Sequence, residues 1–206
     1  MNRWIKNLKA KRSLLVVLFA IVITVVFALT QYSTKEKYKA YVSARFGPDM
    51  PRFVELLERA DRLYAEILEK GSMNGRQSYL LSDIHHDLAD IIRTYRDLAV
   101  FLRLRDDSFR YNQSSPNAMI IMRYFNDPDI ESPINLDQRT RNHIAVFREF
   151  DSGWIAAVDR DIVSYRINDA SWLRFLEAIE TSTITFLAER QMDSLNDLWQ
   201  DRKSTR

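Results

Sequence analysis

The sequence predicts an all-α protein, with a single N-terminal transmembrane helix that continues into a stalk and then an antiparallel helical-bundle domain. Three observations lead to this prediction. A stretch of 18 residues near the N-terminus lacks any charged side chain. Beyond it, apolar residues recur at helical spacing, and alternating strand patterns are scarce. The 4 glycines and 5 prolines gather in a few short segments that divide the 206-residue chain into helix-length pieces.

The transmembrane helix is predicted at residues 13–30. This segment contains 13 Leu, Ile, Val or Phe residues, and 18 helical residues span about 27 Å, close to the ~30 Å hydrocarbon core of a bilayer. The apolar side chains favour insertion by roughly 4–8 kcal/mol. A buried core helix is the competing interpretation, but the segment is apolar around its whole circumference, which favours the membrane.

The charges that flank the span predict its orientation. Residues 1–12 contain five basic side chains and no acid, whereas three lysines on the other side are partly offset by Glu36. The positive-inside tendency therefore predicts a short cytoplasmic tail at 1–12 and an extracytoplasmic remainder. The short basic tail and the absence of cysteine favour the plasma membrane of a bacterium.

A cleavable signal peptide competes with this signal anchor. A cut after Ala28 would release a secreted protein. The apolar run continues through Leu29 and Thr30 and is longer than the usual signal-peptide core, which favours an uncleaved anchor.

The next segments are predicted to be a helical stalk at 31–46 and a first bundle helix at Pro51–Lys70. No helix breaker stands before the sequence FGPDMP at 46–51, which is expected to turn the chain into an extracytoplasmic domain at 47–200. The bundle helix has apolar residues at 3-4 spacing, with Asp49 as its expected cap and Gly71 at its end.

The strongest helical pattern lies at about Ser78–Leu104. Seven apolar residues repeat at 3-4 spacing without a miss: Leu81, Ile84, Leu88, Ile91, Tyr95, Leu98 and Leu102. Such a seam packs against the other helices of a bundle or against a second copy, and the first is the commoner outcome. The polar loop at 71–77 predicts an antiparallel hairpin with the preceding helix.

The helical spacing of apolar residues becomes less regular after this helix. The sequence predicts a loop at 112–116, a short helix or strand at Met119–Phe125, and a helix at Leu136–Asn168 that glycine could break at 151–153. A last helix is expected from Asp169 or Ser171 towards Trp199, followed by a frayed C-terminus at 201–206.

Three side chains form the candidate metal site. Asp83, His86 and Asp90 are spaced to share one helix face, and imidazole with carboxylate oxygens suits a divalent transition metal. The apolar seam, however, places His86 and Asp90 towards water, with His85 at its border. A Glu-x-x-His motif is absent, so an ordinary solvated helix face is the favoured interpretation. The sequence predicts no catalytic residue and no cofactor.

Other candidates carry weaker signals. His143 precedes an apolar helical stretch, and the acid pairs Asp127/Asp129 and Asp159/Asp161 are expected to be surface carboxylates. GxSxG, SxxK and HExxH are absent, and the sequon at Asn112 matters only in a eukaryotic secretory pathway. A set of aromatic residues is expected to pack in the core, with a ligand groove as the alternative: Tyr124, Phe125, Phe147, Phe150, Trp154, Tyr165, Trp172 and Trp199.

Composition narrows the function classes. Residues 31–206 hold 25 basic and 28 acidic side chains, which argues against a nucleic-acid partner, and glycine-rich phosphate loops are missing. The sequence therefore predicts a non-catalytic accessory or scaffold subunit, whose partners are the lipid bilayer at 13–30 and a protein in or near the membrane. A ligand-sensing module is the alternative, and a metal-dependent enzyme is the third hypothesis.

Overall fold

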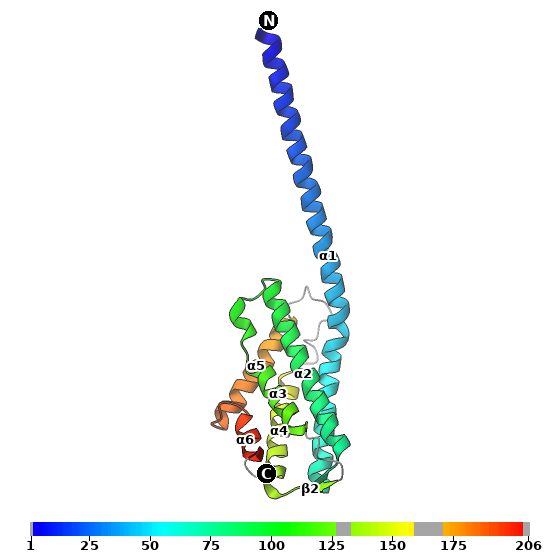
Figure 1. Ribbon diagram of the computed structural model, residues 1–206, viewed down its shortest axis with the longest axis vertical. Coiled ribbons are helices and arrows are strands. Elements are labelled where there is room, and N and C mark those ends of the chain that lie inside the picture. The colour runs from blue at the N-terminus through cyan, green and yellow to red at the C-terminus, as the bar shows by residue number, and fades with distance from the viewer. Residues whose placement is uncertain (1, 127–132, 159–170, 204–206) are drawn as a thin grey trace. The chain divides into compact units, whose positions relative to one another are not determined.

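A computed structural model describes residues 2–126, 133–158 and 171–203, with side chains described from Leu18 onward apart from several in the stalk and at 201–203. Its helices are α1 (Asn2–Lys70), α2 (Gly75–Phe101), the 3₁₀ helix η1 (Asp107–Arg110), α3 (Ser114–Phe125), α4 (Gln138–Ala157), α5 (Ser171–Glu189) and α6 (Asn196–Lys203). Two-residue strands β1 (Ser72–Met73) and β2 (Ile134–Asn135) pair antiparallel. The all-α bundle class is confirmed (Figure 1).

The chain divides into two units, residues 1–45 and 46–206. The first unit is the N-terminal part of α1. Among the described residues, none of the helices has an apolar stretch long enough to cross a bilayer. The predicted span at 13–30 begins at residues whose side chains lie outside this description.

The turn predicted at 46–51 is wrong, because α1 continues through Pro48 and Pro51. Proline lacks the N–H that would bond the carbonyl four residues earlier, so two helical hydrogen bonds are missing here. Contacts with the bundle hold the segment in helical form nonetheless. Met50 is buried, and the expected cap Asp49 instead accepts a 2.7 Å hydrogen bond from the Tyr95 hydroxyl.

The second part of α1 and helix α2 form the predicted antiparallel hairpin. The contact partners run in opposite directions along the two helices: Asp49 with Tyr95, Arg52 with Asp87, and Tyr64 with His85. The connection is tight because Gly71 adopts a φ of 65°, and a Cβ at that position would run into the Arg141 side chain. β1 follows directly and pairs with β2.

Helix α2 begins and ends three residues earlier than predicted. A capping box fixes its start: the Asn74 side chain accepts from the Gln77 backbone N–H, and the Gln77 side chain accepts from the Asn74 N–H. The end is set by Arg103, which takes a φ of 57°. Most of the predicted seam is buried inside the second unit, as a bundle requires, although Leu98 and Leu102 are only half-buried.

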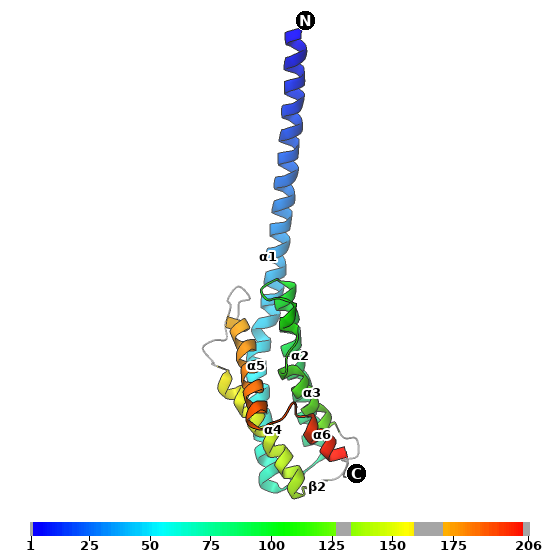
Figure 2. The same cartoon turned by 90° about the vertical axis from the view of Figure 1, so that its left-hand side faces the viewer.

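The later helices refine the weaker predictions. Helix α3 starts within the loop expected at 112–116. Helix α4 runs unbroken through Gly153, where a Cβ would stand 2.9 Å from the Ser182 hydroxyl, so the glycine allows α4 and α5 to approach closely. The α2–α3 and α4–α5 pairs lie side by side (Figures 1 and 2).

The predicted helix towards Trp199 is interrupted. Helix α5 ends at Glu189, Gln191 takes a φ of 54°, and α6 starts at Asn196. The Asn117 side chain accepts a 2.7 Å bond from the Leu195 N–H, which fixes this turn against α3. Helix α6 ends at Lys203, inside the segment expected to fray.

Candidate functional site

The predicted metal-site residues lie on the outer face of α2. His86 Nε2 is 3.6 Å from Asp90 Oδ2, and these side chains are 52% and 42% exposed. Asp90 also bonds the Arg93 guanidinium at 2.7 Å, and Asp83 is exposed. In the part of the chain that the structure describes, no group of three or more His, Cys, Asp or Glu side chains has the geometry to hold a metal ion.

A different histidine forms a buried polar cluster that the sequence did not predict. His85 Nε2 lies 3.0 Å from Asp151 Oδ2 and 3.3 Å from the Tyr64 hydroxyl. His85 Nδ1 lies 2.8 Å from the carbonyl oxygen of Leu81. Tyr64, His85 and Asp151 have no exposed surface. We call these three side chains the Tyr-His-Asp cluster.

Each member of the Tyr-His-Asp cluster comes from a different helix: Tyr64 from α1, His85 from α2 and Asp151 from α4. Both Tyr64 and His85 follow the apolar rows of their helices. The cluster therefore connects three helices in the core, and its polar atoms face one another rather than a groove. Asp151 Oδ1 is buried without a hydrogen-bond partner among the described residues.

The Tyr64 hydroxyl is held in its protonated form. Burial, with the neighbouring Asp151 carboxyl contributing, raises the pKa of Tyr64 well above its ordinary value. The folded chain therefore keeps a proton that an unfolded chain loses above about pH 10.

Replacing Tyr64 by phenylalanine is expected to weaken the pH dependence of the free energy of unfolding above about pH 10. Because the native chain binds the Tyr64 proton more tightly than the unfolded chain does, this proton's contribution to stability is fully present below about pH 10. It is lost as pH rises, by up to about 1.4 kcal/mol per pH unit. Urea unfolding of the full chain on both sides of pH 10 checks this. Tyr111, which is 85% exposed, is the control: Tyr111→Phe should leave the pH profile of the wild type, and an equal effect of both variants would contradict the prediction.

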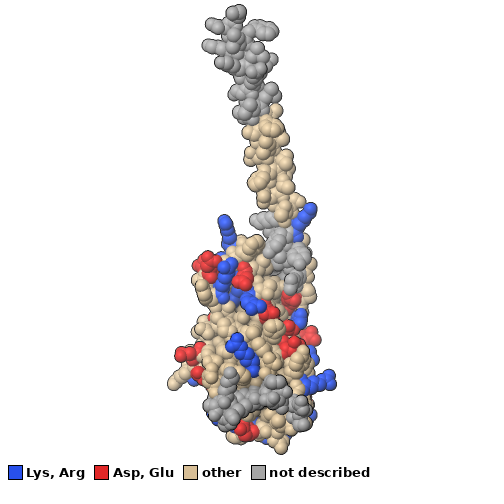
Figure 3. Space-filling model, viewed as in Figure 1, with Lys and Arg blue, Asp and Glu red and all other residues tan. Residues whose placement is uncertain are grey.

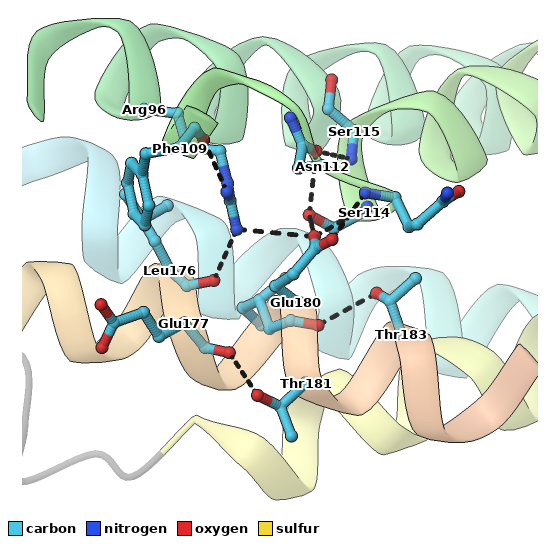
Figure 4. A network of polar contacts seen from close by, with 12 residues as sticks. Arg96, Phe109, Asn112, Ser114, Ser115, Leu176, Glu177, Glu180, Thr181 and Thr183 are labelled. Atoms are coloured by element: carbon cyan, nitrogen blue, oxygen red, sulfur yellow. Dashed lines mark hydrogen bonds and ion pairs between the residues drawn. The ribbon is translucent and has the colours of Figure 1, made fainter. Parts of the chain in front are cut away.

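A second polar network surrounds Arg96, which is buried although charged (Figure 4). Its guanidinium donates to the carbonyl of Phe109 at 2.8 Å and of Leu176 at 3.2 Å, and lies 3.5 Å from Glu180 Oε2. The same guanidinium stacks over the Phe109 ring at 4.5 Å. Burial lowers the pKa of Arg96, which Glu180 and Glu177 oppose.

Glu180 of α5 caps the N-terminus of α3. Its carboxylate accepts hydrogen bonds from the backbone N–H groups of Gln113 at 2.7 Å and Ser114 at 3.1 Å, and from the Ser114 hydroxyl at 2.8 Å. The residue at the cap position of α3 supplies no side-chain bond of its own. A carboxylate at a helix N-terminus is favourable because it meets free N–H groups and the positive end of the helix dipole.

Asn112, the sequon residue, belongs to the same network. Its side-chain oxygen accepts from the Ser115 N–H at 2.8 Å, and its amide nitrogen donates to the Arg110 carbonyl. The Asn112 side chain thus has a structural role at the beginning of α3.

The open grooves on the surface of the second unit include two that described residues line. One, of about 740 Å³, runs between α4 and α5 and is lined mainly by small residues around Gly153 and Ser182. The other, of about 630 Å³, adjoins Glu180 and is lined by Arg93, Arg110 and Tyr111 among others. The guanidinium groups of Arg93 and Arg110 already contact acidic side chains.

The predicted aromatic set lies mainly in the core rather than along these grooves. The members with almost no exposed surface are Tyr124, Phe125, Phe147, Phe150, Trp154 and Trp172. Trp199 is half-buried. Trp154 contacts Phe53 and Phe150, and its indole N–H donates to the Thr183 hydroxyl at 2.9 Å.

His143 is also buried, and its Nδ1 lies 3.2 Å from the Tyr124 hydroxyl. Asp127, Asp129, Asp159, Asp161 and Tyr165 lie outside the described residues. Among the buried polar residues that the structure describes, the sequence singled out His85, at the border of the apolar seam, and His143, ahead of an apolar helical stretch. Comparisons with protein-family models, curated proteins and solved structures find no match for this chain.

Proposed function

We propose that this chain is a membrane-anchored accessory or scaffold protein of the cell envelope and that it acts through protein contacts rather than catalysis. One observation carries the proposal: the large apolar side chains between Leu18 and Tyr32 of α1 are 50–68% exposed. Figure 3 shows this stretch without acidic or basic side chains. Apolar surface of this extent requires lipid or a protein partner.

The polar side chains in this stretch support a lipid environment. The hydroxyls of Thr24 and Thr34 donate to the carbonyls of Ala20 and Thr30 at 2.9 Å, and Thr30 donates to Val26. Each hydroxyl thus has a hydrogen-bond acceptor within the same helix. A bilayer core supplies none, so internal pairing is what a spanning helix needs.

The charges that flank the apolar stretch support a topology with residues 1–12 in the cytoplasm and the bundle outside. In the bundle, the two polar clusters are formed by side chains that pair with one another. Acidic and basic side chains alternate over the face shown in Figure 3, as on a solvated protein surface. These features support a rigid body that presents surfaces to a partner.

Two arginines in the apolar stretch are expected to abolish membrane retention. Each arginine at the centre of a span costs about 2.5–3.5 kcal/mol, so Ile23→Arg with Val26→Arg cancels roughly 5–7 kcal/mol of the insertion energy. Alkaline carbonate extraction of membranes measures retention. The matched control, Ile23→Leu with Val26→Leu, should remain in the membrane pellet.

The same preparations separate the proposal from its alternatives. Native mass spectrometry of the gently extracted wild-type chain should show uncleaved protein with a stoichiometric protein companion, which the double arginine variant loses. Retention of the arginine variant in the pellet would refute the anchor. A mass lacking residues 1–28 would indicate a cleaved signal peptide.

A ligand-sensing module is the alternative proposal. The aromatic residues that were expected to line a ligand groove do not line the two described grooves, whose aromatic lining residues are Tyr111 and Phe186. A partner-free chain carrying an added small-molecule mass would favour this alternative.

A further inference from the structure

We infer that the core contains a proton-binding site: the folded chain holds one proton between His85 Nε2 and Asp151 Oδ2, and its loss at rising pH destabilises the junction of α1, α2 and α4. The site uses the Tyr-His-Asp cluster and is independent of the anchor.

The count of donors and acceptors requires this proton. His85 Nδ1 faces a backbone carbonyl at 2.8 Å, and a carbonyl only accepts, so Nδ1 carries a hydrogen. A neutral imidazole of this form presents a lone pair at Nε2. An ionised Asp151 would present a second lone pair 3.0 Å away. Two acceptors would then oppose each other 3.0 Å apart, so a proton must lie between them.

Two arrangements place the proton there: an imidazolium beside a carboxylate, or a neutral imidazole beside a carboxylic acid. Both give the His85–Asp151 pair a net charge of zero. Without the proton, the pair would bear one negative charge at a site with no exposed surface. Asp151 Oδ1 already lacks a hydrogen-bond partner among the described residues. A buried and uncompensated charge is strongly destabilising.

The surrounding groups do not replace the proton. From α1, the Tyr64 hydroxyl lies 3.3 Å from Nε2 and also hydrogen-bonds the Asp151 carboxyl, but a hydroxyl carries no positive charge, and Asp61 lies one turn earlier. From α4, Arg148 lies one turn before Asp151, but its guanidinium bonds Asp61 at 2.7 Å near the surface.

Among the described residues of the other neighbouring helices, no cationic side chain contacts the cluster either. From α3, Tyr124 contacts His143 of α4, on the far side of Phe125 and Phe147. The acids Glu177 and Glu180 of α5 engage Arg105 and Arg96. Neutralisation of the pair therefore depends on the bound proton.

The pH dependence follows from the unfolded chain. Above about pH 6.5, an unfolded histidine is mostly neutral and an unfolded aspartate is ionised. Folding must then take up one proton. The native state binds more protons than the unfolded state, so stability falls with rising pH, and the unfolding equilibrium constant increases up to about tenfold per pH unit.

Urea unfolding of the full chain in detergent micelles tests the site. Between about pH 7 and pH 9, the unfolding equilibrium constant of the wild type should rise by up to about 100-fold. Asp151→Asn should remove most of this rise, because an amide N–H can donate to His85 Nε2 without taking up a proton. Asp61→Asn, which breaks the surface ion pair between α1 and α4, is the matched control and should keep the wild-type rise.

A wild-type constant that changes less than about threefold over this range would overturn the inference, as would an equal rise in Asp151→Asn and wild type. Imidazole ¹⁵N spectra of the folded wild type provide a test that needs no variant. The exposed His86 is the internal reference on the same helix. The His85 signals should stay constant across the range in which an ordinary imidazole changes its charge, about pH 5–8, and a change in the protonation of His85 within this range would refute the bound proton.

Discussion

Replacing Trp154 by alanine is expected to lower the free energy of unfolding by about 3–5 kcal/mol, which is the usual cost of removing a buried indole. Trp154 has no exposed surface and packs between Phe53 of α1 and Phe150 of its own helix. The cavity would lie where α4 meets α1 and α5, because Trp154 contacts Phe53 and Thr183 of these helices. Urea unfolding of the full chain in micelles measures the loss.

The variant Trp154→Phe distinguishes the stability that comes from the aromatic ring from the stability that comes from its hydrogen bond. The phenyl ring keeps much of the apolar contact but loses the N–H that donates to Thr183. The Thr183 hydroxyl still donates to the Ile179 carbonyl, so the phenylalanine variant should lose clearly less stability than the alanine variant. A loss below about 1 kcal/mol in Trp154→Ala would contradict the packing described for this site.

Replacing Arg96 by alanine is expected to cost about 3 kcal/mol. The guanidinium is the hydrogen-bond donor for the carbonyls of Phe109 and Leu176, and it is the nearest positive charge to Glu180 in the described network (Figure 4). Removing it leaves buried acceptors and a poorly hydrated carboxylate. Chemical unfolding of the variant measures the effect.

Two variants make this prediction specific. Arg96→Lys keeps the charge but loses the planar fork, so it should fall between wild type and alanine. Arg93→Ala, one turn away and 66% exposed with a surface ion pair, should change the stability by no more than about 0.5 kcal/mol. Equal losses in Arg93→Ala and Arg96→Ala would show that Arg96 acts only as a surface charge.

Periodicity was sufficient to predict the bundle helices because burial repeats with the helical turn. Leu81, Leu88 and Ile92 follow this rule and are fully buried. The rule failed at 46–51, where proline predicts a turn. The buried Met50 and the Asp49–Tyr95 bond hold that segment helical, and such long-range contacts leave no local pattern.

The polar clusters were harder to predict for the same reason. His85 and Asp151 are 66 residues apart in the sequence, and each resembles an ordinary helical polar residue. Spacing within one helix selected His86 instead, because Asp90 lies one turn away and still contacts it at 3.6 Å. A pairing between distant helices has no counterpart in local spacing, so only the tertiary structure reveals which histidine is buried.

The contact of Glu180 with the start of α3 has a consequence for synthesis on the ribosome. The carboxylate that completes the first turn of α3 comes 66 residues after Ser114, and Leu195 fixes the other contact to Asn117. A nascent chain that has not yet reached Glu180 therefore lacks the carboxylate that accepts from the N–H groups of Gln113 and Ser114. The start of α3 gains this acceptor only after the C-terminal part of the bundle has been synthesised.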